Sequence, residues 1–121
     1  MTIKAKVSDF IPDVRRITRD TDAASPYRTD ADICRAVVDA IRHMRAVRPE
    51  ARYDDECRLS DVAFPADADA LAAFEVSLNE AWRLGVAYYA SARCYEADVT
   101  DSVSLQLAQT YFKRADEEFA R

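Results

Sequence analysis

Hydrophobic residues in the first part of the chain recur at steps of three and four positions, which is the period of a helix with one apolar side. They are Val7, Phe10, Ile11, Val14 and Ile17. Ser8 can cap such a helix, and Pro12 is tolerated because first-turn amides have no acceptor within the helix. The pattern predicts a helix that begins at Ser8 or Asp9 and ends near Arg19, followed by a connector over residues 19–28.

A second helix is predicted between Thr29 and Pro49, and both of its ends are marked in the sequence. Thr29 can cap it, and Asp32 stands at the third helical position, which completes the pattern of a capping box. Pro49 ends the helix because a proline disfavours helical dihedral angles at the preceding Arg48. The apolar stripe consists of Ile33, Val37, Ala40, Met44 and Val47.

Residues 49–68 form the only long stretch without a helical period. Their larger apolar residues are spread out, at Tyr53, Cys57, Leu59, Val62 and Phe64. A loop of this length in a small domain is usually functional or contains strands of its own. We therefore expect an extended or hairpin excursion between the second and third helices.

A long third helix is predicted from Asp67 or Asp69 to Tyr95. Its main apolar stripe is Leu71, Phe74, Leu78, Ala81, Gly85, Tyr88, Ala92 and Tyr95, and a second stripe is Trp82, Val86 and Tyr89. A helix with two apolar stripes must contact more than one neighbour. A glycine inside a helix costs roughly 1 kcal/mol relative to alanine. We therefore expect Gly85 to permit a close helix crossing or a bend.

The segment ADVTDSV interrupts the pattern and offers Thr100 or Asp101 as the next cap. A fourth helix then spans about Ser102 to Ala120. Its apolar seam is Leu105, Ala108, Phe112, Ala115 and Phe119, flanked by Leu107 and Tyr111. Together the patterns predict an all-α fold, a single domain over residues 1–121. It is a small bundle of about four helices with one long central helix and the excursion between helices two and three.

Composition narrows the class of protein. A chain of 121 residues can bury a core without disulfides or a metal. Gly85 is the single glycine, so the glycine-rich loops that hold phosphate in P-loop and Rossmann folds are excluded. The net charge of −5 disfavours binding of polyanions by the protein as a whole, although a local basic face can still meet phosphate.

The sequence also bears on location. The first residues have no apolar run that resembles a secretion signal, and no run approaches the roughly 18 apolar residues that a membrane span needs. Cys34, Cys57 and Cys94 are widely spaced in the chain. We expect no export, no membrane partner, and reduced thiols of the kind found in a bacterial cytosol.

Candidate chemistry is sparse. His43 stands four residues after Asp39 and could form an acid–base pair, but no partner nucleophile is indicated, so a half-buried or surface pair is expected. Structural zinc sites draw ligands from close pairs, which the cysteines do not form. The acidic clusters YDDEC and PADAD lack the spacing and turn glycine of a calcium loop. We expect no catalytic residue, no metal ligand and no cofactor.

Arginines offer more. Arginine greatly outnumbers lysine, and its planar fork of donors suits interfaces and phosphate. Three interpretations stay open: local pairing such as Asp13–Arg16 and Asp39–Arg42, a protein interface, or nucleic acid. The candidate interface residues are Arg15, Arg16, Arg19, Arg35, Arg42, Arg45, Arg48, Tyr53, Leu59, Phe64, Tyr111 and Phe119.

Three stretches resemble segments of one protein family. VSDFIPDVRRITRDTD is similar to its opening helix and connector. YRTDADICRAVVDAIRHMRAVRPEA is similar to a motif in which RWTD-E-LL leads into a helix that ends RP-A. FPADADALAAFEVSLNEAWRLGVAYYASARCYEADV, followed by AQTYFKRADEEFA, is similar to its long helix, short acidic break and final helix. Over nearly its whole length the chain thus resembles the head–tail connector adaptors, or head-completion proteins, of tailed bacteriophages. It departs from them in lacking the tryptophan before TD and in retaining only Asp39 of the polar centre of helix two.

The resemblance implies a non-enzymatic structural subunit that forms a homo-oligomeric ring, a dodecamer, beneath the portal protein. Such a ring extends the DNA channel, through which DNA passes transiently, and docks the tail or nozzle protein. The implied location is the head–tail junction of the virion, after synthesis in the bacterial cytoplasm. In such a ring each subunit needs two different complementary sides. The alternative is a stand-alone helical interaction or regulatory protein that binds nucleic acid through the faces Arg15–Arg19 and Arg42–Arg48.

Overall fold

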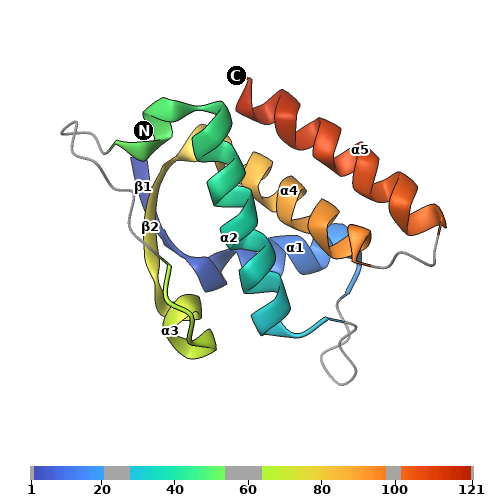
Figure 1. Cartoon of the computed structure of the whole chain (residues 1–121), viewed down its shortest axis with the longest axis horizontal. Helices are drawn as coiled ribbons and strands as arrows, with labels where there is room; N and C mark the ends of the chain where they lie inside the picture. The colour runs from blue at the N-terminus through green and yellow to red at the C-terminus, as the bar shows by residue number, and fades with distance from the viewer. Residues whose placement is uncertain (1, 21–27, 54–63, 98–101, 121) are drawn as a thin grey trace.

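A computed structural model describes residues 2–20, 28–53, 64–97 and 102–120 of the chain (Figure 1). The α-helices are α1 (Ile11–Thr18), α2 (Asp30–Val47), α3 (Ala68–Ala73), α4 (Arg83–Glu96) and α5 (Ser102–Phe119). The strands are β1 (Thr2–Lys6) and β2 (Glu75–Asn79), and the 3-10 turns are η1 (Val7–Phe10), η2 (Pro49–Arg52) and η3 (Glu80–Trp82). The prediction of a mostly helical chain is therefore confirmed.

Helix α4 is the centre of the arrangement. It packs against α1, α2 and α5, and in Figure 1 it lies between α2 and α5. The largest side chains that are fully buried come from all sides of this packing, and they are Phe10, Phe119, Ile33, Ile41, Met44, Val7, Val14, Val37 and Val86. None of the described helices is long and apolar enough to cross a membrane.

The predicted second helix is confirmed as α2. The Thr29 hydroxyl accepts a hydrogen bond from the Asp32 amide at 3.2 Å. Only this half of the capping box is seen, because the Asp32 carboxylate binds Arg35 at 3.1 Å instead. The helix ends before Pro49, as predicted.

The first and last helices also match their predictions. The first is η1 followed by α1, and it ends at Arg19 in a left-handed conformation with φ of 57°. The last is α5, whose predicted caps Thr100 and Asp101 lie outside the described residues. Gly85 permits a close helix crossing, as expected: a Cβ atom there would lie 2.6 Å from the Phe119 ring.

The prediction of a long third helix is wrong. The structure places α3, β2 and η3 before α4, so that only residues from Arg83 onward continue as one helix. Val76 and Leu78 are buried and alternate with more exposed neighbours, which is the period of a strand. Their two-residue spacing was absorbed into a three-and-four pattern because Leu71, Phe74 and Leu78 also fit a helix.

Strand β1 was not predicted, and its pairing with β2 explains why the predicted third helix is interrupted. It pairs antiparallel with β2 over the whole register from Thr2↔Asn79 to Lys6↔Glu75. This pairing satisfies the backbone of β2 outside a helix. Two strands distant in sequence are invisible to local periodicity, because each is only five residues long.

The predicted excursion over residues 49–68 is partly described. It begins with η2, and Tyr53 follows in extended conformation. Phe64 is half-buried and packs on Phe74 with ring centroids 5.3 Å apart. Residues 54–63, which include Cys57, Leu59 and Val62, lie outside the described residues.

Candidate interaction surfaces

Arg15 braces the start of α2 from inside and is not available as a contact residue. Its guanidinium binds Asp20 at 3.0 Å, Asp30 at 2.6 Å and the Arg28 carbonyl at 3.0 Å. The Asp20 side chain is only 4% exposed. It also accepts a hydrogen bond from the Arg28 amide at 3.0 Å. This arginine therefore neutralises a buried carboxylate and joins α1 to α2.

Arg45 and Arg48 likewise serve the fold. Arg45 is buried, with its guanidinium 5.8 Å from the centre of the Phe64 ring. Arg48 donates to the Phe119 carbonyl at the end of α5 and binds Glu50 at 3.3 Å. The guanidiniums thus tie the end of α2 to its neighbours. The sequence could not separate these roles from surface roles, because both occur at helical spacing.

The remaining predicted arginines are exposed. Arg16 binds Asp13 at 3.5 Å, as its spacing suggested, and its side chain is 77% exposed. Arg35 binds Asp32, and Arg42 lies 5.6 Å from the centre of the Phe64 ring. Arg19 ends α1 on the surface.

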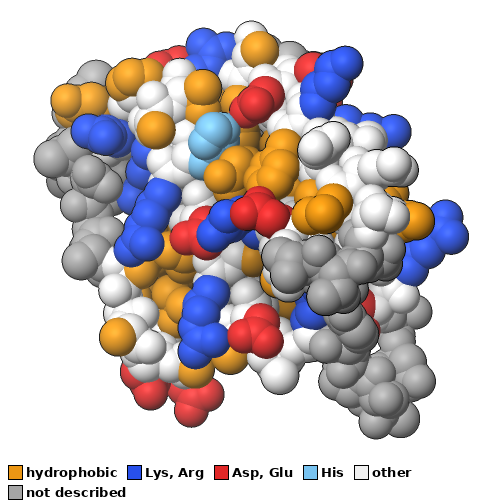
Figure 2. Space-filling view, turned by 45° about the vertical axis from the view of Figure 1, so that its right-hand side comes forward, with side chains coloured by type: hydrophobic (Ala, Val, Ile, Leu, Met, Phe, Trp, Pro, Cys, Tyr) orange, Lys and Arg blue, Asp and Glu red, His pale blue; other side chains and the backbone are white. Residues whose placement is uncertain are grey.

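The outward side of α2 carries Arg35, Asp39 and Arg42, which we call the arginine face. It separates two open hollows. One, of about 340 Å³, lies toward α4 and is lined in part by Arg28, Arg93 and Cys94. The other, of about 430 Å³, lies toward Phe64, Pro65, Ala66 and Leu71. Figure 2 shows basic side chains spread across this side of the molecule with acidic ones between them.

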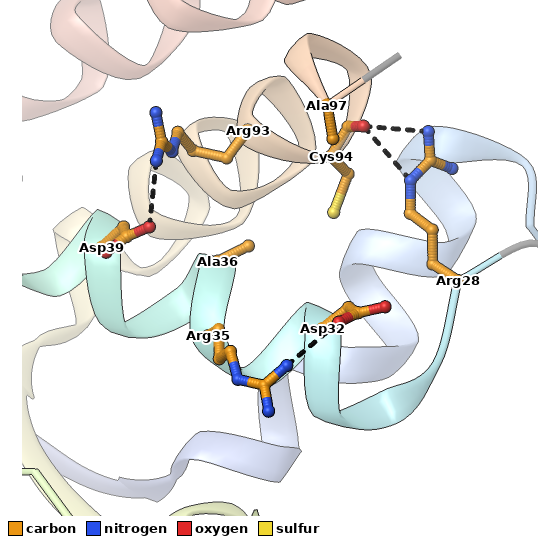
Figure 3. A pocket seen from close by; sticks show the side chains of 8 residues that line it. All are labelled: Arg28, Asp32, Arg35, Ala36, Asp39, Arg93, Cys94 and Ala97. Atoms are coloured by element: carbon orange, nitrogen blue, oxygen red, sulfur yellow. Dashed lines mark hydrogen bonds and ion pairs between the residues drawn. The ribbon is translucent and has the colours of Figure 1, made fainter. Parts of the chain in front are cut away.

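The guanidiniums around the first hollow are held by the protein itself (Figure 3). Arg93 reaches from α4 to Asp39 at 3.3 Å and to Glu96 at 3.2 Å. Arg28 donates twice to the Cys94 carbonyl, at 3.3 and 3.1 Å. Asp39 therefore pairs with Arg93, not with Arg42 as its spacing in the sequence suggested. In this hollow Arg93 is therefore paired with carboxylates, whereas Arg28 is held by a backbone carbonyl.

His43 joins α2 to α5. Its Nε2 lies 2.9 Å from Asp116 Oδ1, and its ring stacks on Tyr89 with centroids 4.5 Å apart. Burial raises the pKa of the Tyr89 hydroxyl above its ordinary value, while Arg93 acts in the opposite direction. The expected partner Asp39 does not meet this histidine. The arrangement is a tie between helices, in which Tyr89 packs further on Phe112 at 5.0 Å.

A second surface lies along α4 and α5, and only Tyr111 of it was predicted. The Tyr111 ring stacks on Tyr88 at 5.7 Å and on Tyr95 at 5.9 Å, with interplanar angles of 19° and 8°. Arg114 lies over Tyr111 at 5.4 Å and over Tyr88 at 6.0 Å. We call Leu84, Tyr88, Tyr95, Tyr111 and Arg114 the tyrosine face. Tyr88 and Tyr95, seven residues apart, belong to the main apolar stripe predicted for the third helix, so the sequence pattern indicates contact between helices for them and gives no signal for Leu84 or Arg114.

The environment of Tyr95 is partly apolar and partly basic. Burial raises the pKa of its hydroxyl most, and Tyr111 adds to the rise, whereas Arg28 and Arg19 oppose it. The Arg28 guanidinium lies 5.5 Å from the centre of the Tyr95 ring. Arginines therefore bracket the stacked rings at both ends.

The other predicted contact residues divide in the same way. Tyr53 is 54% exposed and is available for a partner. Phe119 is 1% exposed because it fills the space beside Gly85, so it belongs to the core. Phe64 packs against the core from the edge, and Leu59 lies outside the described residues.

The cysteine and acidic residues that the structure describes do not form a metal-binding cluster. Cys34 and Cys94 are free and buried, and burial raises the pKa of both thiols. Among the described residues, no group of three or more histidine, cysteine, aspartate or glutamate side chains could hold a metal ion.

Comparisons with known proteins assign no family to the chain. No protein-family model matches the chain, and searches of curated proteins and of solved structures return no match.

Proposed function

We propose that this chain is a subunit of the head–tail connector ring of a tailed bacteriophage, an adaptor that binds beneath the portal protein. The ring, a dodecamer in this proposal, extends the channel for DNA and docks the tail or nozzle protein. Its location is the head–tail junction of the virion. The proposal begins from the resemblance of the helix order and helix ends to those proteins.

The structural observation that supports it is the presence of two different surfaces on separate sides of α4. The arginine face belongs to α2, and the tyrosine face belongs to α4 and α5. A subunit of a closed ring repeats one heterologous contact with its neighbours, and it needs a further surface for the portal or the tail. The tyrosine and arginine content of the second surface is typical of interface centres.

The arginine face is the better candidate for the portal or tail protein. Arg35 and Arg42 are exposed on a long, well-anchored helix, and the two adjoining hollows can receive side chains of a partner. Exposed charges of this kind favour association rate and partner choice more than affinity. We therefore assign the ring contact and the axial contact to different faces.

The decisive experiment mixes the purified full chain with a phage portal protein and examines the mixture by cryo-electron microscopy. We expect a ring of chains seated on one end of the portal. Neighbouring genes for portal, capsid and terminase would support the same conclusion. A portal that stays bare at every salt concentration, together with a chain that retards DNA in a gel, would refute the proposal.

That second outcome defines the alternative, a helical regulatory protein that binds nucleic acid. In the structure, fewer arginines of its predicted faces, Arg15–Arg19 and Arg42–Arg48, are available to phosphate than the sequence suggested. Arg15 binds Asp20 and Asp30 within the fold, and Arg48 binds Glu50 and the end of α5. Each such pairing removes a positive charge from the set that phosphates could neutralise. We therefore place the alternative second.

A further inference from the structure

The tyrosine face continues as an apolar strip along one edge of α5. Val103, Leu107, Tyr111 and Arg114 follow one another at steps of four, four and three residues, so they lie on one side of the helix. Val103 is 59% exposed and Leu84 is 47% exposed, and the two mark opposite ends of the strip. Beside Tyr88 lies a hollow of about 340 Å³, lined by Ile17, Leu84 and Ala87 and bordered by the charged residues Asp13, Arg16, Glu80 and Arg83. Exposed apolar surface that is bordered by polar groups marks a contact site.

The stacking of the rings indicates which kind of partner fits. Tyr111 already stacks on Tyr88 and on Tyr95. Arg114 and Arg28 cover further ring surface. A nucleic-acid strand binds aromatic residues through free ring faces, and part of these faces is taken up by Arg28 over Tyr95 and by Arg114 over Tyr88 and Tyr111. Their edges, hydroxyls and guanidiniums suit a protein surface with carboxylates.

Charge around the strip favours such an acidic partner. Arg114 forms no ion pair with any described residue, and its guanidinium is held only over rings. Arg28 and Arg19 lie near Tyr95 at the other end. Near Leu84, the one carboxylate of Asp13 faces two guanidiniums, since it lies 3.5 Å from Arg16 and 3.7 Å from Arg83. Arginines therefore border the strip from Leu84 to Tyr95.

The chain itself carries a surface of the opposite kind. Residues 64–82 contain Asp67, Asp69, Glu75 and Glu80 and no lysine or arginine. Lys6 lies opposite Glu75 in the sheet, and the two aspartates at the start of α3 are exposed. Residues 66–70 are all exposed and otherwise alanine. A helix end with small side chains can approach a partner closely.

These two surfaces lie far apart on one molecule. In Figure 1, α3 is at the left and the beginning of α5 is at the right. They cannot meet within one copy, but they can meet between copies, and such a contact repeats from subunit to subunit.

We propose that the tyrosine face of one copy binds the acidic α3 end of a second copy. This inference rests on the proposed function, because it names the two sides through which neighbouring subunits of the ring meet. Asp67 and Asp69 approach Arg114 and Arg28, and the alanines of α3 pack against the apolar strip.

The test uses two full-length variants that each lose one side. In D69K/A70K the α3 end becomes basic, while Asp67 keeps its hydrogen bond to the residue-70 amide, which is 2.9 Å long. In R114E/L84S the tyrosine face loses its free guanidinium and an exposed leucine. Circular dichroism confirms that both fold. Association is followed by sedimentation velocity up to about 1 mM, where even an affinity near −4 kcal/mol would register.

The wild-type chain should associate in a concentration-dependent manner that added salt weakens, and each variant alone should associate at least about ten-fold more weakly. A mixture of the two variants should restore a dimer, since one intact face of each kind remains. With ¹⁵N label in D69K/A70K, the shifted NMR signals should lie in α4 and α5. Two differently labelled samples of D69K/A70K are the matched control and should not interact.

A mixture that stays monomeric, a wild-type chain that stays monomeric, or shifts confined to the arginine face would each overturn the inference. The two proposals fail separately. If R114E/L84S still forms a ring on the portal, the proposed α3 contact is refuted and the connector function stands. If the mixture of variants forms a dimer but the portal stays bare, the α3 contact stands and the connector function is refuted.

Discussion

At the residue scale, Gly85 sets the distance between α4 and α5. A Cβ atom there would meet the Phe119 ring at 2.6 and 2.9 Å and the Glu118 Cβ at 3.1 Å. The ring cannot move away freely, because it is buried and the carbonyl of the same residue is held by Arg48. The one glycine of the chain is therefore a packing requirement of a helix crossing.

We predict that Gly85→Ala destabilises the protein by up to about 2 kcal/mol in urea denaturation. Overpacking costs about 1–3 kcal/mol, and the better helix propensity of alanine returns about 1 kcal/mol. The control is the same change in a Phe119→Leu background, where the smaller side chain leaves room and the loss should shrink. Equal losses in both backgrounds would show that the close approach does not matter.

Arg15 and Arg16 are neighbours with opposite roles, and they give a matched pair of substitutions. Arg15→Ala should cost about 3 kcal/mol, because it removes the guanidinium that neutralises the buried Asp20 carboxylate. Arg16→Ala should change stability by less than about 0.5 kcal/mol, since its side chain is 77% exposed and exposed pairs contribute little. Chemical denaturation of both variants measures the difference. Similar losses in the two variants would show that Arg15 does not stabilise the contact between α1 and α2.

The buried thiols give a prediction for pH. Burial raises the pKa of Cys34 and Cys94 above the ordinary value of 9.0. Above that value the unfolded chain releases thiol protons that the folded chain still holds, so stability falls as pH rises. Between about pH 8 and pH 10, the Cys34→Ala/Cys94→Ala variant should lose less stability than the wild type in urea titrations. Parallel losses in the two proteins would show that the thiols do not contribute.

At the scale of elements, local periodicity succeeded where an element ends by its own chemistry. Thr29 and Pro49 mark α2 in the sequence, and the structure places its ends there. Periodicity failed where partners distant in sequence decide the outcome. Val76 and Leu78 become a strand because β1, more than sixty positions earlier, pairs with them. The same limit applies to the surfaces, since only the packing of α5 on α4 joins Tyr111 to Tyr88.

At the scale of the whole molecule, the arginine and tyrosine faces come near each other at Arg28, which lines the first hollow and lies over Tyr95. Arg35 and Arg42 themselves are on α2, whereas the tyrosine face is on α4 and α5, so we expect the two faces to bind different partners. We predict that Arg35→Glu/Arg42→Glu lowers binding to the portal at least about ten-fold, since reversed charges at an interface repel their partner groups. The same variant should still self-associate like the wild type, because it keeps both the tyrosine face and the acidic α3 end. Both arginines are exposed, so its unfolding midpoint should stay close to that of the wild type.

The matched control for that variant is Lys113→Glu, which reverses an exposed charge on α5 and should leave portal binding unchanged. Microscale titration of labelled chain against portal gives the affinity, and sedimentation gives the self-contact. If the Arg35/Arg42 variant binds portal normally but no longer self-associates, the assignment of the two faces is inverted. If both contacts weaken together, one surface serves both partners. Only selective loss of portal binding fits a subunit that uses α2 along the ring axis and α4 with α5 around it.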